Sequence, residues 1–191
     1  MSDTITKGTP EVQFTKIRNV VSPSRANGND AGTDWFVPEY DEQFLEDLIE
    51  KNSANDLEIS IIPHPNKEGE KAVKIVIPPN QQVMIPSGIK VWIKNKDSYL
   101  QATNKSGIAT KLRLVVGADT VDADYQGEVH INLCNIGSGY ATLVSGQKAV
   151  QFIHKEYIKT VWEEISNDMY DQIETSSRGA GGFGSTGLFN K

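Results

Sequence analysis

The feature that most constrains the fold of this chain is a series of short segments in which apolar and polar residues alternate. Alternation with a period of two predicts β-strands, because successive side chains of a strand point to opposite faces of a sheet. We expect strands at residues 11–17, 57–62, 72–77, 83–85, 89–93, 99–102, 111–116, 128–133, 140–144 and 148–153, with a further candidate at 157–163. Turn-forming residues separate them, for example at 86–88. The pattern predicts an all-β jelly-roll protein, built from two packed layers of antiparallel sheet.

One stretch interrupts the series of strands. Asp41 is a candidate N-cap for a short helix. The apolar residues that follow recur at helical spacing and would form one stripe: Phe44, Leu45, Leu48 and Ile49. A turn-rich connection at 63–69 then joins two of the expected strands. We interpret residues 39–76 as a small helix-plus-hairpin insertion, for which a packing role is the simplest explanation.

The composition is typical of a globular protein and excludes several classes of function. The 191 residues are 38% hydrophobic and 23% charged, and 19 basic against 25 acidic residues give a net charge of −6. This charge argues against a general nucleic-acid or anionic-membrane surface. We find no export leader and no apolar run long enough to span a membrane. Cys134 is the single cysteine, so an intrachain disulfide is excluded, and we expect a cytoplasmic location.

The strongest candidate for chemistry is the stretch 120–127, between the strands expected at 111–116 and 128–133. It predicts the tip and return arm of a β-hairpin, with Asp122 and Asp124 on one face and Tyr125 on the other. Two carboxylates on one face repel each other, which is understandable if one is a base or faces a cation. Taken alone, a polar hairpin tip explains the same residues.

Two further segments have the composition of phosphate contacts. Lys105-Ser106-Gly107 offers a positive charge, a hydroxyl and a backbone N–H at a strand end, although ordinary loops share this composition. We interpret residues 1–175 as the β domain and 176–191 as a flexible, glycine-rich arm. In this arm Arg178 could bind phosphates and Phe183 could stack on a base. The arm is no Walker motif, because no lysine directly follows its last glycine, and a disordered tail is the simpler alternative.

Taken in order, these segments resemble the motifs of the trimeric dUTP pyrophosphatase (dUTPase) family, and the resemblance covers nearly the whole chain. The matching segments are 31–34, 105–107, 117–127, 146–151 and 178–187. The third and fifth are the most specific. The resemblance implies a jelly-roll homotrimer that hydrolyses dUTP to dUMP and pyrophosphate with Mg²⁺, at active sites shared between chains.

The resemblance also implies a role for individual residues. Asp122 would be the general base that activates the attacking water, and Tyr125 would pack against the deoxyribose. The hairpin backbone around Gly117, Thr120 and Val121 would read the uracil edge. Phosphates would be held by Lys105, Ser106, Gly107 and Gln151. Asp34 would lie near the water shell of a metal that is bound mainly through the substrate phosphates. The arm would close over the nucleotide with Arg178, Phe183, Gly184 and Ser185.

This chain departs from the family pattern at several positions. Lys105 stands where arginine is usual, Asp119 where glycine is usual, and Gln147-Lys148 replaces an Asp-Arg pair. The 39–76 segment lies outside the pattern and suggests an enlarged, phage-type member.

Three alternative interpretations stay open from the sequence. A dCTP deaminase would share the fold and the nucleotide pocket, but the stretch at Asp122 lacks the glutamate that its chemistry needs. A dUTPase-like binding protein could engage a regulatory partner through residues 39–76. A purely structural jelly roll, such as a capsid component, would leave the carboxylate stretch and the arm unexplained.

Overall fold

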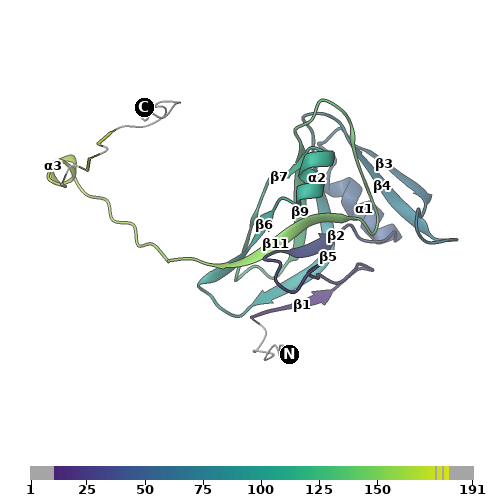
Figure 1. Cartoon of the computed structure of the whole chain (residues 1–191), viewed down its shortest axis with the longest axis horizontal. Coiled ribbons are helices and arrows are strands. Elements are labelled where there is room, and N and C mark those ends of the chain that lie inside the picture. Colours follow the sequence, from purple (N-terminus) through teal and green to yellow (C-terminus); the bar gives the residue numbers. More distant parts are fainter. Residues whose placement is uncertain (1–10, 175, 178, 181–191) are drawn as a thin grey trace. The chain divides into compact units, whose positions relative to one another are not determined.

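The structure is a computed structural model that describes residues 11–174, 176–177 and 179–180. The chain divides into two compact units, Met1–Ile158 and Lys159–Lys191. The first unit holds all the strands in the described part of the chain, in three antiparallel sheets (Figure 1). The all-β, jelly-roll-like prediction is therefore confirmed.

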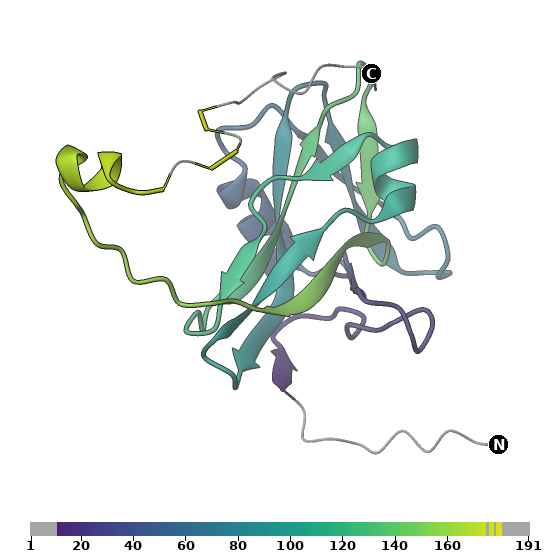
Figure 2. The same ribbon diagram turned by 60° about the vertical axis from the view of Figure 1, so that its left-hand side comes forward.

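Two four-stranded sheets and one three-stranded sheet make up this unit. The first has the order β1 (Val12–Lys16), β5 (Gln82–Ile93), β9 (Glu128–Asn135), β7 (Leu114–Val116). The second has the order β2 (Thr33–Phe36), β11 (Lys148–Glu156), β6 (Ser98–Thr103), β8 (Thr120–Asp122). The third consists of β10 (Ala141–Val144), β4 (Lys71–Ile77) and β3 (Glu58–Pro63). The short helix α2 (Ser106–Lys111) lies at the end of the strands away from β1 (Figures 1 and 2).

The core forms where the apolar faces of these elements meet, as the alternation predicts. Burying one such aliphatic side chain contributes roughly 1.5–3 kcal/mol. Among the described residues, the largest side chains with less than 2% exposure are Phe44, Leu48, Ile75, Ile77, Ile85, Ile89, Ile93, Leu114, Ile131, Leu133, Leu143 and Val37. The rings of Trp35 of β2 and Phe152 of β11 pack within it at a tilt of 46°, with centroids 4.5 Å apart.

The predicted helix-plus-hairpin segment is present and is packed into this core. Helix α1 (Glu42–Lys51) begins after Asp41, whose Oδ1 accepts a hydrogen bond from the Phe44 N–H at 2.7 Å. Phe44 and Leu48 are fully buried. Strand β4 pairs with β3 on one side and with β10 on the other. The predicted cap and hairpin are therefore confirmed, and both contribute to the stability of the β domain.

Several sequence predictions about local structure were wrong. Residues 86–88 form a bulge inside the continuous strand β5, because the register with β9 shifts between Pro86 and Lys90. Residues 106–111 form α2, so β7 begins only at Leu114. The candidate strand at 157–163 is irregular. After it the chain forms the short helix α3 (Asn167–Asp171), capped by Ser166. No helix in the described part of the chain is long and apolar enough to cross a membrane.

Candidate functional site

A buried carboxylate organises one candidate site at the edge of the second sheet. Asp34 of β2 is only 4% exposed. Its Oδ1 lies 2.9 Å from Lys105 Nζ, and its Oδ2 lies 2.7 Å from Lys148 Nζ. Burial opposes ionisation of Asp34, but the hydrogen bonds from Lys148 and Lys105 outweigh it, so the pKa of Asp34 is lowered. The ionised carboxylate therefore holds two ammonium groups, and the net positive charge of this cluster suits an anion.

A β-bulge brings the predicted residue Gln151 to the same cluster. Gln151 lies opposite Asp34 on β2 and opposite Thr103 on β6, and its Nε2 donates to the Asn104 carbonyl at 3.1 Å. Residues three apart on a regular strand face opposite ways, but β11 carries a register shift between Lys148 and Val150. The extra residue puts Lys148 on the face of Gln151. The sequence analysis treated Lys148 only as a departure from the family pattern. Its place three residues before Gln151 was the signal that could have marked it as a site residue.

The predicted hairpin around residues 120–127 is correct at its base and wrong in its outer part. β7 pairs with β9, and the Gly117 N–H continues the ladder by donating to the Asn132 carbonyl at 3.1 Å. The chain then leaves β9, and β8 pairs instead with β6 of the other sheet. Gly117 permits this exit, because a Cβ there would lie 2.0 Å from Asn132 Oδ1.

The divergence of β8 from β9 leaves a pocket of about 190 Å³ between them. Its lining includes the predicted residues Thr120, Val121, Asp122 and Tyr125, with Val129, His130 and Phe152 on other sides and Ala118 and Asp119 at the exit from β7. A narrow space beside extended backbone, which offers N–H and C=O groups, suits a flat ligand with its own donors and acceptors.

The two carboxylates of this stretch have different surroundings. The Asp122 side chain is exposed and has no hydrogen-bond or ion-pair partner within the described residues. Asp124 binds Lys96, with 2.9 Å between Oδ1 and Nζ, which offsets the repulsion between the two acids. The Tyr125 hydroxyl donates to the Glu128 carbonyl at 2.8 Å. Asp122 is thus the carboxylate that is open to a ligand or water.

Asp119, which stands where the resemblance expects glycine, is accommodated by β6. Gln101 Nε2 donates to Asp119 Oδ2 at 2.8 Å, and the Thr120 hydroxyl donates to Oδ1 at 3.1 Å. The pKa of Asp119 is lowered by both hydrogen bonds, and the one from Gln101 has the larger effect. The backbone carbonyl of Asp119 also accepts from the Ala102 N–H at 2.7 Å. The carboxylate is therefore tied to the neighbouring strand.

Comparison with known proteins decides the family. The family model described as dUTPase matches residues 71–187, which is more than half of the 191-residue chain. The chain belongs to the dUTPase family. The match begins at β4 and includes the Asp122 stretch, the two lysines at 105 and 148, and Gln151.

Individual dUTPases support this assignment. The deoxyuridine 5'-triphosphate nucleotidohydrolase of Maricaulis maris is 36% identical over 115 residues, 59% of this chain and 72% of that protein. The enzyme of the same name from Rickettsia felis is 35% identical over 117 residues, 60% of this chain and 74% of that protein. The structure of the Staphylococcus bacteriophage 80alpha dUTPase with dUPNHPP has a TM-score of 0.65 at 19% identity, and covers 94% of this chain and 100% of its own. At this low identity the phage structure supports the fold alone.

Within one chain the predicted site residues form two well-separated groups. Asp122 lies opposite Tyr99 on β6, whereas Gln151 lies opposite Thr103, four residues further along the same strand. At about 3.3 Å per residue, this offset alone is about 13 Å. The structure therefore brings together Asp34, Lys105 and Gln151, and separately Gly117, Thr120, Val121, Asp122 and Tyr125. The predicted arm residues Arg178, Phe183, Gly184 and Ser185 lie outside the described residues.

The described residues provide no metal site of their own. No group of three or more His, Cys, Asp or Glu side chains among them could hold a metal ion. Both oxygens of Asp34, the predicted outer contact of a metal, already bind lysines. The carboxylate thus fits a metal ligand poorly.

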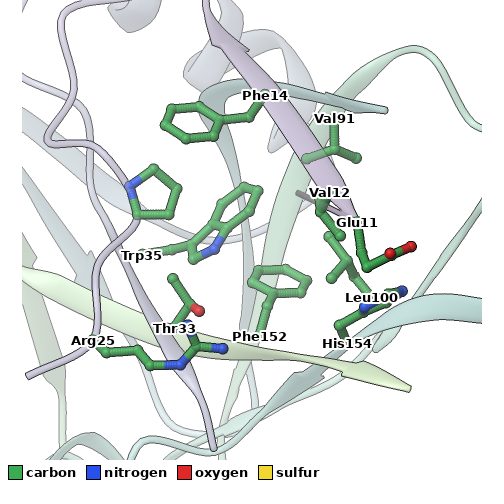
Figure 3. A pocket seen from close by; sticks show the side chains of 11 residues that line it. Glu11, Val12, Phe14, Arg25, Thr33, Trp35, Val91, Leu100, Phe152 and His154 are labelled. Atoms are coloured by element: carbon green, nitrogen blue, oxygen red, sulfur yellow. The ribbon is translucent and has the colours of Figure 1, made fainter. Parts of the chain in front are cut away.

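A larger cavity shares Phe152 with the pocket between β8 and β9 but is otherwise lined by other residues. It has a volume of about 370 Å³ and is lined largely by apolar side chains of β1, β2, β5 and β11, including Phe14, Trp35 and Phe152 (Figure 3). None of the predicted site residues lines it. Its size therefore does not make it the candidate active site.

Proposed function

We propose that this protein hydrolyses dUTP to dUMP and pyrophosphate, with Asp122 as the general base, and so limits dUTP and supplies dUMP. One observation carries the proposal. In a chain of the dUTPase family, an exposed carboxylate without a partner among the described residues lines the pocket between β8 and β9. Its neighbour Asp124 is engaged by Lys96, so only one of the two acids is available to a water molecule.

The pocket suits the nucleoside part of dUTP. The uracil ring would enter between β8 and Val129–His130, where its edge meets backbone groups from Gly117 to Val121. The small volume leaves little room for a 5-methyl group, which favours dUTP over dTTP. The Tyr125 ring would lie against the deoxyribose and exclude a 2′-hydroxyl by steric contact.

The chemistry requires one proton transfer and one substitution at phosphorus. Asp122 removes a proton from water, whose oxygen forms a bond to the α-phosphorus while the bond to the leaving pyrophosphate breaks. Lys105, Lys148, Ser106, Gly107 and Gln151 would hold the β- and γ-phosphates and offset their charge. Mg²⁺ carried by the substrate phosphates would neutralise further charge. Asp34, whose two oxygens bind lysines, would take no part in holding the metal.

The separation between Asp122 and Gln151 supports a site to which more than one chain contributes. A dUTP molecule that contacts Asp122 of one chain would place its outer phosphates on Asp34, Lys105 and Lys148 of another. A homotrimer, as the family resemblance implies, provides such interfaces. In the same proposal Arg178 contacts the terminal phosphates, Phe183 stacks on the base, and Gly184 and Ser185 complete the closed arm.

The test is pyrophosphate release from dUTP, dCTP, dTTP and UTP with Mg²⁺ and with EDTA. We expect release from dUTP alone, lost in EDTA. Asp122→Asn should lower kcat by about 10²–10⁴. Asp124→Asn, an exposed acid two residues away, is the matched control and should change kcat only a few-fold. Intact dUTP after incubation with the wild-type chain would refute the proposal. Ammonia release from dCTP would support the deaminase instead.

A second role, binding a regulatory partner through residues 39–76, is favoured by one observation. β3 is the edge strand of its sheet, and Ile61 on it is 44% exposed. An open edge accepts an added strand from a partner. Deleting 39–76 would remove the core residues Phe44 and Leu48, so a point change is the better test. Ile61→Asp should abolish capture of a host protein while dUTP hydrolysis continues, and unchanged capture would refute this role.

A further inference from the structure

A buried charged cluster links the predicted insertion to the start of β11. Glu39, just after β2, is 5% exposed. Its Oε2 lies 3.1 Å from His64 Nε2 and its Oε1 lies 2.8 Å from Lys67 Nζ. His64 and Lys67 both come from the turn between β3 and β4. The hydrogen bond that the Lys67 ammonium donates to the Glu39 carboxylate raises the pKa of Lys67. The hairpin tip is thereby anchored to the segment that follows β2.

The hydrogen bonds around His64 define its tautomer. The Asn66 N–H donates to His64 Nδ1 at 3.1 Å, so Nδ1 is the acceptor. The remaining proton lies on Nε2, which donates to the Glu39 carboxylate. The neutral ring satisfies both partners and holds the carboxylate in one orientation.

The turn before β11 packs directly on this cluster. Gly146 has a φ of +77°, and a Cβ there would lie 3.1 Å from Glu39 Oε1 and 3.6 Å from His64 Nε2. The Gly146 N–H donates to the Val37 carbonyl at 2.9 Å, and the Val37 N–H donates to the Gln147 carbonyl at 2.9 Å. The next residue is Lys148, whose ammonium binds Asp34. Glu39 therefore supports the turn that positions Lys148, one of the lysines proposed to bind the outer phosphates.

We propose that Glu39 and His64 are positioning residues for the triphosphate, because they hold the turn at Gly146 and thus Lys148. This inference rests on the proposed function and extends it to a segment outside the dUTPase motifs. Displacing Glu39 would free the turn, move the Lys148 ammonium from its place on Asp34 and weaken contacts to the outer phosphates. Glu39, His64 and Lys67 do not line the pocket between β8 and β9, which would bind the nucleoside.

The experiment compares two ligands that differ in their outer phosphates. Binding of a non-hydrolysable dUTP analogue and of dUMP is measured by calorimetry for the full chain with Mg²⁺, together with Tm. Glu39→Gln has nearly the same shape but directs an NH₂ group at a donor, either His64 or Lys67. We expect this change to weaken binding of the analogue about tenfold and binding of dUMP less than about twofold. Lys67→Met should act in the same direction and Lys67→Arg should restore affinity.

Glu68→Gln is the matched control, because Glu68 is an exposed acid on the same hairpin tip. It should leave both affinities unchanged. Equal weakening of both ligands, or no weakening in Glu39→Gln and Lys67→Met, would overturn the inference. If Glu39→Gln does not fold, the comparison of Lys67→Met with Lys67→Arg tests the inference instead. The Lys67 side chain is 40% exposed, so these changes should leave the fold intact. If the wild-type chain binds neither ligand, the proposed function fails first, and the inference fails with it.

Discussion

Lys148 binds Asp34 across the second sheet, with 2.7 Å between Nζ of the lysine and Oδ2 of the carboxylate. Lys105 occupies the other oxygen. The carboxylate is almost fully buried, whereas the lysine side chains are 40% and 27% exposed. Asp34 therefore serves as a fixed anchor from which two cations reach toward solvent, and this arrangement leads to the first two predictions.

Asp34→Asn should destabilise the fold in a pH-dependent way. The pKa of Asp34 is lowered in the folded chain, so its contribution is fully present above the unfolded value of about 3.9 and is lost as the pH falls through the folded pKa. At pH 7 we expect a loss of about 1–3 kcal/mol, discounted for the exposure of the lysines. Urea unfolding at pH 7 and at successively lower pH gives the free energy of unfolding of the wild type and of Asp34→Asn. If the difference in unfolding free energy between the two chains does not shrink in acid, the stabilising role of the ionised Asp34 is contradicted.

Lys148→Met should weaken the triphosphate without affecting the nucleoside. Removing one ammonium should lower affinity for a non-hydrolysable dUTP analogue about tenfold, while dUMP binding stays unchanged. Lys148→Arg keeps the charge and should retain affinity within about threefold. Calorimetric titration of the three chains checks this. Equal affinities for the analogue in all three would show that Lys148 serves the fold alone.

Two impaired variants should regain activity when they share an oligomer. Asp122→Asn lacks the base and Lys105→Met lacks a phosphate contact, and the two residues would come from different chains of one site. Random mixing at equal amounts should leave about a quarter of the sites intact. Co-refolding the two chains and assaying pyrophosphate release measures this. Activity no higher than the sum of the separate variants would place both residues in one chain's site.

Gly146→Ala should cost more stability than the same change at Gly69. Both glycines have a φ of +77°, so both substitutions meet the left-handed backbone penalty of about 1–2 kcal/mol. A Cβ at Gly69 has nothing within 4 Å, whereas at Gly146 it lies 3.1 Å from Glu39 Oε1. The extra loss at Gly146 should be about 1 kcal/mol. Thermal unfolding of the pair isolates this contact, and equal losses would mean that the turn does not press on Glu39.

The sequence by itself determined the local elements and the family of this protein. Alternation predicted most strands because the side-chain period of a strand is written directly in residue order. Asp41 and the apolar stripe after it predicted α1 for the same reason, and its cap was confirmed. Five motif segments taken in order, with that around Asp122 among the most specific, predicted the dUTPase family, which the comparisons confirm.

Only the tertiary structure decided which of these elements meet. Alternation says which face of a strand is apolar but not which strand lies beside it, so the pairing of β8 with β6 was missed. The bulge that turns Lys148 toward Asp34 depends on β2, and the support of Gly146 by Glu39 and His64 depends on the distant β3–β4 turn. These contacts join residues far apart in the chain, and their free energy depends on closing long loops rather than on local preference.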